Sequence, residues 1–256
     1  MEEDYNIYKD MTYKQLYVRD NADTTLSKAP AARYYFANVT GVDREFGRIL
    51  AELKRLGLDK NTIVVFTSDH GETMCSQGTL DPKNSIYTES FNVPMIIRYP
   101  EKIRPHVDTT LMSSVDIMPT LLSMAGLQDE IPQSAEGQDL SSILMEKDEA
   151  CQAPTAALYI RNVNGEVAPD GKVSGFFPVA RGIRTATHTM EIAISRKGTL
   201  AGVKIFDDKA DPYQMHPIDW RTNPQLFATL TDILRDKLRE ANDVWYRENI
   251  LDNILK

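Results

Sequence analysis

The sequence has little of what marks several classes of protein. Its 256 residues include only two cysteines, Cys75 and Cys151, which are too few to define a disulfide framework and leave the cellular compartment open. No apolar run approaches the roughly 20 residues of a membrane span. The acidic opening "MEEDYNIYKDMTYKQLY" also lacks the apolar core of a signal peptide. We therefore expect no membrane partner and no signal peptide in this stretch.

Positive charge is also scarce. The 29 Lys and Arg residues are outnumbered by 37 Asp and Glu residues, which gives a net charge of −8. There is no basic run and no RNP-like or zinc-finger spacing, so nucleic acid is not expected as a partner. The hydrophobic content of 42% is enough for a substantial core, and the length fits one large α/β domain or one domain with a small partner.

The first half of the chain has the pattern of an α/β protein. Residues 1–30 are polar with turn signals and are predicted to be an extended arm or linker. Helical spacing of apolar residues predicts a long amphipathic helix from about residue 34, ending at Gly57. Apolar runs at 62–67 and 93–99 predict buried strands, and a second helix is predicted over 113–127. Apolar strands flanked by helices favour a parallel sheet within residues 31–150.

The pattern changes after about Leu144. Short strands separated by turn residues predict an antiparallel sheet, with strands at 157–161, 179–185, 189–194 and 199–207. A long amphipathic helix is predicted from about Pro224, with an apolar stripe that continues to Trp245. The predicted fold class is therefore α/β, followed at 151–256 by a small C-terminal α+β subdomain with a long terminal helix.

The most informative segment is "TIVVFTSDHGE" at 62–72, in which Asp69 and His70 directly follow a predicted strand. Ligands of open α/β sheets bind beyond the carboxyl ends of strands, so the position suits a metal site. Adjacent side chains can face one ion only where the strand has ended, and Gly71 would supply the backbone freedom for that. The alternative is a turn in which Ser68 and Asp69 cap a following helix.

Two ligands do not complete a metal site. Ca²⁺ takes about six to eight oxygen ligands and Mg²⁺ about six. Zn²⁺ takes about four, with His and Asp acceptable among them. If Asp69 and His70 bind a cation, the other ligands must come from elsewhere.

Taken together, these segments resemble the sulfatases of the alkaline-phosphatase superfamily. The resemblance covers nearly the whole chain and rests on the order and spacing of several segments: "YYFANVTGVDREFGRILAELKRLGLDKNTIVVFTSDHGE", "KNSIYTESFNVPMIIRYP", "SSVDIMPTLLSMAG", "EGQDLSSIL", "RGIRTATH" and "VKIFDDKADPYQMHPI". It implies a partial alkaline-phosphatase-like sheet with flanking helices, corresponding to the C-terminal half of a sulfatase.

The resemblance also implies roles for single residues. Asp69 and His70 match family ligands of a divalent cation, Ca²⁺ or Mg²⁺. Lys83 matches a lysine that contacts the substrate sulfate and assists the leaving group, where its charge would offset the developing oxyanion. Without the flanking pattern, Lys83 would be an ordinary surface lysine. Glu89 and Asp116 are implied to be structural. Arg181 and Arg184 are also implied to be structural, although these two could alternatively contact substrate.

The family's nucleophile is missing from this stretch. Sulfatases carry Cys-x-Pro-x-Arg or Ser-x-Pro-x-Arg, whose first residue becomes formylglycine, and an aspartate pair that completes the cation site. Cys75 opens "CSQGT" and Cys151 opens "CQAPT", and neither fits. We therefore expect the formylglycine in an N-terminal half outside this stretch, and no turnover by this chain alone.

The chain departs from the family in two further places. The segment "TMCSQGTLDPK" (73–83) stands where the family often has a Gly-x-His-Gly turn. Gln214 stands where an acid is common. The loop that leads to Lys83 is therefore expected to differ from that of other family members.

Three functions remain open from the sequence. The favoured one is a sulfuric ester hydrolase acting on a sulfated small molecule or glycan. A phosphoester hydrolase or phosphoglycerol transferase of the same superfamily would use Zn²⁺ or Mn²⁺, for which His70 is a good ligand. The third is a non-catalytic module descended from a sulfatase. Because both halves would build one sheet, strands 62–67 and 93–99 would expose an edge, and we expect self-association.

Overall fold

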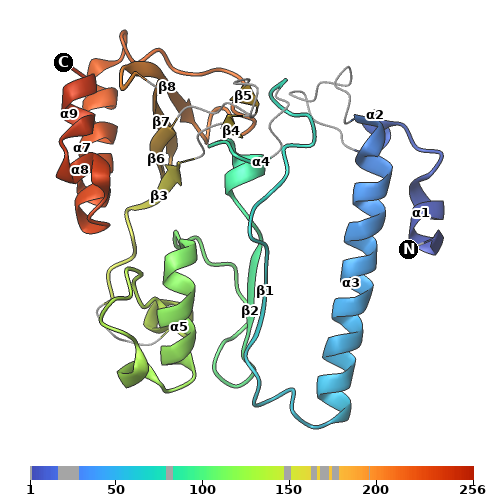
Figure 1. Cartoon of the computed structure of the whole chain (residues 1–256). Helices are drawn as coiled ribbons and strands as arrows, with labels where there is room; N and C mark the ends of the chain where they lie inside the picture. Colours follow the sequence, from blue (N-terminus) through green and yellow to red (C-terminus); the bar gives the residue numbers. More distant parts are fainter. Residues whose placement is uncertain are drawn as a thin grey trace. The chain divides into compact units, whose positions relative to one another are not determined.

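The computed structural model describes residues 2–16, 29–78, 83–146, 151–162, 166–167, 173–174, 179–195 and 197–256. The chain divides into two compact units, Met1–Pro105 and His106–Lys256 (Figure 1). The domain boundaries predicted from the sequence, near residues 30 and 150, remain predictions. Among the described residues, no helix is both long enough and apolar enough to cross a membrane.

In the first unit, the N-terminal segment folds back on the longest helix. The helices α1 (Glu2–Tyr8) and α2 (Tyr13–Leu16) precede α3 (Ala32–Arg55). Asp4 on α1 accepts two hydrogen bonds from the Arg44 guanidinium on α3, at 2.5 and 3.0 Å. The segment expected to be extended therefore contains two helices, because α1 gains a partner on α3.

The long helix α3 forms as its apolar periodicity predicts. Gly57 follows its C-cap Leu56 with φ +67°, and the Gly57 N–H donates to the Lys54 carbonyl at 3.1 Å. The left-handed conformation suits glycine because it carries no Cβ. The predicted end of the helix is confirmed.

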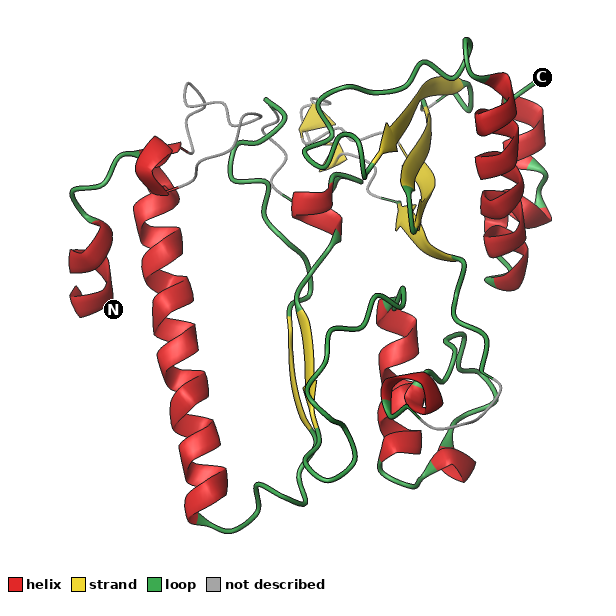
Figure 2. Ribbon diagram, turned by 180° about the vertical axis from the view of Figure 1, so that it is seen from behind, coloured by secondary structure: helices red, strands yellow, loops and turns green. Residues whose placement is uncertain are grey.

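The strands β1 (Val64–Thr67) and β2 (Met95–Arg98) confirm both predicted apolar strands of this unit. They pair antiparallel, with Val64 opposite Arg98, and lie side by side in Figure 2. The predicted parallel pairing is wrong for this pair. A parallel connection needs a crossover of a dozen or more residues, usually helical, whereas the only described helix between these strands is the single-turn α4 (Thr88–Phe91).

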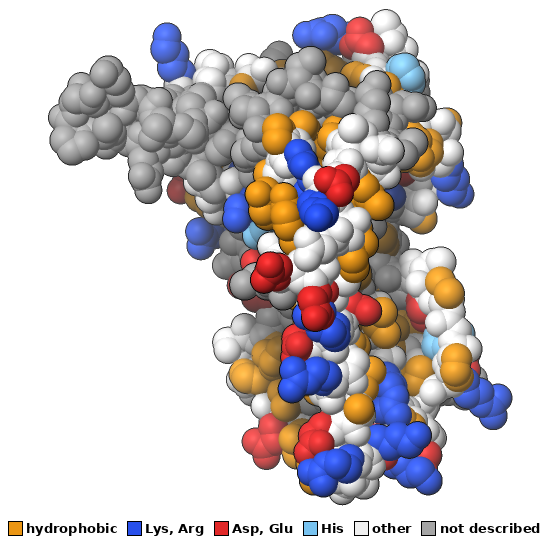
Figure 3. Space-filling model, turned by 90° about the vertical axis from the view of Figure 1, so that its right-hand side faces the viewer, with side chains coloured by type: hydrophobic (Ala, Val, Ile, Leu, Met, Phe, Trp, Pro, Cys, Tyr) orange, Lys and Arg blue, Asp and Glu red, His pale blue; other side chains and the backbone are white. Residues whose placement is uncertain are grey.

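One face of α3 remains uncovered within its unit. Its buried residues are only Ala32 and Ala37. Hydrophobic side chains that are 50–57% exposed follow its length: Val39, Val42, Ile49 and Leu56. Figure 3 shows hydrophobic side chains exposed among charged ones on this side of the molecule. An amphipathic helix with such a face normally buries it against another surface.

The second unit begins with short helices. They are η2 (Ser114–Asp116), α5 (Ile117–Met124), η3 (Gln128–Glu130) and α6 (Ser141–Leu144). Ser113 and Asp116 form a capping box, and the 6% exposed Asp116 accepts hydrogen bonds from the N–H groups of Ser113 and Gln138, both at 2.7 Å. The structural role predicted for Asp116 is confirmed.

A four-stranded antiparallel sheet follows, in the order β3-β6-β7-β8. Its strands are β3 (Ala156–Arg161), β6 (Val179–Thr185), β7 (His188–Ile194) and β8 (Leu200–Asp207), all close to the predicted ranges. The short strands β4 (Glu166–Val167) and β5 (Val173–Ser174) pair separately. The predicted C-terminal antiparallel sheet is confirmed.

One face of this sheet packs against the terminal helices. The core includes Ile183, Ile192 and Ile205 from the sheet and Leu234 from α7 (Pro224–Glu240), all fully buried. The helix predicted to reach Trp245 ends instead at Glu240 and is followed by α8 (Val244–Arg247) and α9 (Ile250–Ile254). Asp243 starts α8 by accepting a hydrogen bond from the Trp245 N–H at 2.8 Å.

Candidate metal and substrate site

Asp69 and His70 lie just beyond the C-terminal end of β1, as predicted. The Asp69 carboxylate is 82% exposed and the His70 imidazole 39% exposed, with 3.3 Å between His70 Nε2 and Asp69 Oδ2. Two potential cation ligands therefore meet at one exposed point of the first unit.

Local hydrogen bonds shape this turn. The His70 N–H donates to Asp69 Oδ1 at 3.0 Å, and Ser68 Oγ donates to the His70 carbonyl at 2.8 Å. The His70 N–H lowers the pKa of the Asp69 carboxyl, so the carboxylate is ionised at neutral pH. The next described helix, α4, begins only at Thr88, so the alternative in which Ser68 and Asp69 cap a following helix finds no support.

Gly71 fixes this turn against the chain before β2. Its N–H donates to the Ser90 carbonyl at 2.9 Å, and a Cβ at this position would lie 2.0 Å from the Glu89 carbonyl oxygen. Gly71 is not among the residues with positive φ. The predicted reason for this glycine, unusual backbone freedom, is therefore wrong, and the close approach of another backbone requires it. The Glu89 carbonyl oxygen is the backbone atom that an added Cβ at position 71 would meet first.

Asp69 and His70 alone do not make a metal site. Within the described part of the chain, no group of three or more His, Cys, Asp or Glu side chains is placed to hold a metal ion. A carboxylate oxygen is a ligand that Ca²⁺ and Mg²⁺ prefer, and an imidazole also accepts transition metals. Asp69 and His70 could thus supply two ligands, and a cation bound there would need further ligands from other residues.

Lys83 follows residues 79–82, which lie outside the described part of the chain. Its side chain is exposed, and the chain after it enters the interior at Ser85 and Ile86, which are 6% and 1% exposed. The predicted contact of Lys83 with substrate remains a prediction.

Arg181 stabilises the second unit from within. Its guanidinium is 1% exposed, pairs with Asp243 at 3.0 Å, and donates to Asn162 Oδ1 at 2.8 Å. It also lies over the Trp245 ring, 5.3 Å from the centroid. The structural role predicted for Arg181 is confirmed, and substrate contact is not supported by its burial.

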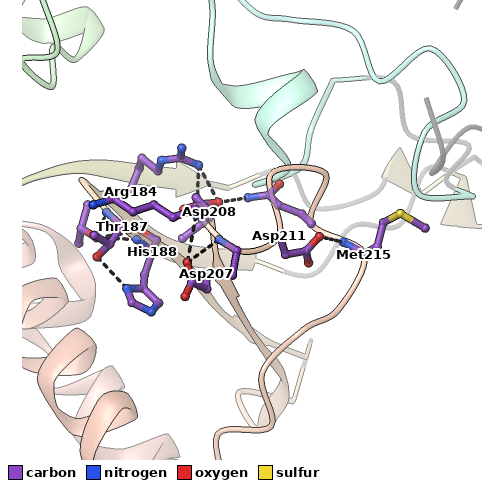
Figure 4. Close-up of polar contacts among 12 residues, drawn as sticks. Arg184, Thr187, His188, Asp207, Asp208, Asp211 and Met215 are labelled. Atoms are coloured by element: carbon purple, nitrogen blue, oxygen red, sulfur yellow. Dashed lines mark hydrogen bonds and ion pairs between the residues drawn. The ribbon is translucent and has the colours of Figure 1, made fainter. Parts of the chain in front are cut away.

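Arg184 belongs to a second polar network, shown in Figure 4. It pairs at 2.8 Å with Asp208, which also accepts hydrogen bonds from Thr189 Oγ1 at 2.8 Å and Gln214 Nε2 at 2.9 Å. Burial raises the pKa of Asp208, against the opposing effect of these three partners.

This network explains the departure at Gln214. An acid there would place a second carboxylate against Asp208, whereas the amide donates to it. Sequence reasoning noticed Gln214 but missed Asp208, because an Asp-Asp pair at a strand end carries no signal of what each side chain contacts.

Two family models match the chain. "Sulfatase" matches residues 4–127, and "N-sulphoglucosamine sulphohydrolase, C-terminal" matches residues 77–243. The two matches together reach from α1 to the start of α8.

Curated relatives and solved structures agree with this. An endo-4-O-sulfatase of Bacteroides thetaiotaomicron is 47% identical over 253 residues, covering 98% of this chain and 50% of that protein. An ulvan-active sulfatase of Formosa agariphila is 33% identical over 211 residues, covering 80% of this chain and 37% of that protein. A solved structure of a Bacteroides thetaiotaomicron protein of glycosaminoglycan metabolism has a TM-score of 0.91 at 47% identity, over 99% of this chain and 52% of that one. The chain spans about half the length, or less, of these curated relatives.

Proposed function

Because the chain belongs to the sulfatase family, we propose that it forms part of an enzyme that hydrolyses sulfate esters of a glycan. The observation that carries this proposal is the 47% identity to an endo-4-O-sulfatase over 98% of the chain. Two of these similar proteins are linked by name to polysaccharides, one to ulvan and one to glycosaminoglycan metabolism. We therefore infer a sulfated polysaccharide in preference to a small sulfate ester.

Three residues would act on the sulfate group. Asp69 and His70 would hold a divalent cation, Ca²⁺ or Mg²⁺, which supplies positive charge beside the transferring sulfate. Lys83 would place a second positive charge against the sulfate oxygens and assist the leaving group. The formylglycine nucleophile and the remaining cation ligands would come from sulfatase residues outside these 256.

The exposed face of α3 also needs a partner. We propose that sulfatase residues outside these 256 supply it. The apolar side chains of α3 and the 59% exposed Ile96 on β2 are all left exposed by the described elements of their unit. We propose that the rest of the sulfatase domain packs on them and pairs with the β1–β2 edge.

Asp69→Asn is expected to lower kcat/KM for a sulfated glycosaminoglycan oligosaccharide by about 100-fold or more, since a bound cation contributes several kcal/mol of transition-state stabilisation. The measurement uses the complete gene product, before and after chelation and with Ca²⁺ or Mg²⁺ restored. Asp129→Asn, in an exposed 3-10 turn, is the matched control and should change kcat/KM by less than about twofold. An aryl phosphate hydrolysed faster than the sulfated glycan would instead favour the phosphoester alternative.

The 256-residue chain by itself is expected to show no sulfatase turnover and to self-associate through the α3 face. Light scattering should give a mass above the 28.9 kDa of a monomer, rising with concentration. Val42→Glu on α3 should shift the mass towards the monomer, because it places a charge in the apolar face. Val107→Glu, at an isolated side chain that is 92% exposed, should not. A monomer at all concentrations would contradict this prediction.

A further inference from the structure

A groove lies at the outer edge of the C-terminal sheet. β8 is the last strand in the order β3-β6-β7-β8, so no further strand of the described structure pairs with its outer edge. Residues 217–221 cross this edge, where the Ile218 N–H donates to the Ile205 carbonyl at 2.8 Å. Residues 200–203 of β8 and 217–221 together line a groove of about 370 Å³, which is within the size range of small-ligand sites.

One turn brings an aromatic ring and two charged side chains to this groove. Trp220 is half-buried and packs against Phe227 on α7, with 4.9 Å between the ring centroids. The Arg221 guanidinium lies over the Trp220 ring, 4.9 Å from its centroid, although the Arg221 side chain is 72% exposed. The Asp219 carbonyl accepts a hydrogen bond from Asn223 Nδ2 at 3.0 Å, which stabilises the turn. The ring and the turn therefore orient an exposed guanidinium beside the groove.

The Arg221 guanidinium is suited to bind an anion. The carboxylate of Asp219 lies 3.8 Å from it, beyond hydrogen-bond distance. A guanidinium offers a rigid fork of donors to the oxygens of a sulfate or a carboxylate. Because its stacking on Trp220 already restricts the side chain, less entropy is lost when an anion binds.

A peptide strand fits this edge less well than a small ligand does. An added strand needs a continuous row of backbone donors and acceptors. The Ile205 carbonyl already accepts from Ile218, and Pro217 has no N–H to offer. The register between β8 and β7 also shifts at residues 200–202, which interrupts the row.

We propose that this groove binds one unit of an anionic polysaccharide, with the sulfate or carboxylate of that unit on the Arg221 guanidinium. This inference rests on the proposed function, because a sulfated polysaccharide carries anionic groups along its length. The sugar ring would lie against Leu200, Val203 and Trp220, which line the groove, and Asp219 would accept a hydrogen bond from a sugar hydroxyl. A second contact of this kind raises the affinity for a polymer without adding a group to the proposed cation site.

The test measures binding of a sulfated glycosaminoglycan to the complete gene product by calorimetry, with a chelator present to prevent turnover. Arg221→Met should raise the Kd about fivefold or more, because charge-assisted hydrogen bonds are lost. Arg239→Met is the matched control. It removes an exposed arginine that pairs with Asp236 on α7, and it should leave the Kd unchanged. Arg221→Lys keeps the charge without the fork of donors, so its Kd should lie between those of wild type and Arg221→Met.

A second probe identifies the bound group. With the chemically desulfated glycosaminoglycan, the effect of Arg221→Met should persist if the bound group is a carboxylate and disappear if it is a sulfate. Either result supports the groove as a site for an anionic sugar.

The other outcomes separate this inference from the proposed activity. A wild-type protein that binds no glycosaminoglycan, an unchanged Kd in Arg221→Met, or an equal rise in Arg239→Met overturns the inference. A light-scattering mass that falls in Arg221→Met would also overturn it, since the groove would then join two copies of the chain. Binding that depends on Arg221, in a protein that turns over no sulfate ester, would instead refute the proposed activity and support the groove.

Discussion

Replacing Arg181 by methionine is expected to lower the free energy of unfolding by about 3–5 kcal/mol, as when one partner of a buried ion pair is removed. The Asp243 carboxylate, 8% exposed, would lose its ion pair while remaining in the interior. The ring of Trp245 would also lose the guanidinium that lies over it. Urea unfolding followed by tryptophan fluorescence measures the change.

Two further variants separate the charge effect from general damage. Arg181→Met combined with Asp243→Asn removes both charges and keeps a side-chain oxygen that can accept from the Trp245 N–H, so this double variant should recover about half of the loss. Arg221→Met breaks a solvent-exposed pair with Asp219 at 3.8 Å and should cost less than about 1 kcal/mol. A loss below about 1 kcal/mol for Arg181→Met would show that this buried pair contributes little to stability.

Features that depend on local periodicity could be predicted from the sequence. The four strands of the C-terminal sheet were within one residue of their observed ranges, because alternation and turn residues are local signals. The long helix α3 follows from its apolar stripe in the same way. The adjacency of Asp69 and His70 after a strand left a turn and a cation site both open, and the resemblance to sulfatases favoured the cation site, which stays a prediction.

Features that depend on distant contacts could not be predicted in this way. The helix α1 forms in a segment expected to be extended, and its Asp4 pairs with Arg44 on α3. The terminal helix is interrupted after Glu240, and Asp243 in the interruption forms an ion pair with Arg181 on β6. The antiparallel pairing of β1 and β2 accompanies a close backbone contact of Gly71 with Glu89 and Ser90, just before β2. Periodicity does not encode such a contact.

The close backbone contact of Gly71 with Glu89 and Ser90 predicts a large effect of substitution at this position. Gly71→Ala is expected to lower the free energy of unfolding by about 3 kcal/mol or more, at or above the usual cost of overpacking, because the new Cβ would meet backbone atoms. It would lie 2.0 Å from the Glu89 carbonyl oxygen and 2.9 Å from the Glu89 carbonyl carbon. The Asp69–His70 turn must then move away from α4, so affinity for the cation proposed to bind there should fall about tenfold or more. Urea unfolding and Ca²⁺ calorimetry on the complete gene product measure the two effects.

Two other glycines distinguish loss of the site from loss of stability. Gly137→Ala would place a Cβ 1.9 Å from the Val115 carbonyl oxygen in the second unit, so it should destabilise the protein similarly without changing cation affinity. Gly47→Ala, on an exposed position of α3 with no atom within 4 Å, should stabilise the protein by about 0.5–1 kcal/mol. If Gly71→Ala bound Ca²⁺ with wild-type affinity, the position of the Asp69–His70 turn would not depend on its contact with α4. A loss of Ca²⁺ affinity in Gly71→Ala, but not in Gly137→Ala, would show that this backbone contact positions the two proposed ligands, Asp69 and His70.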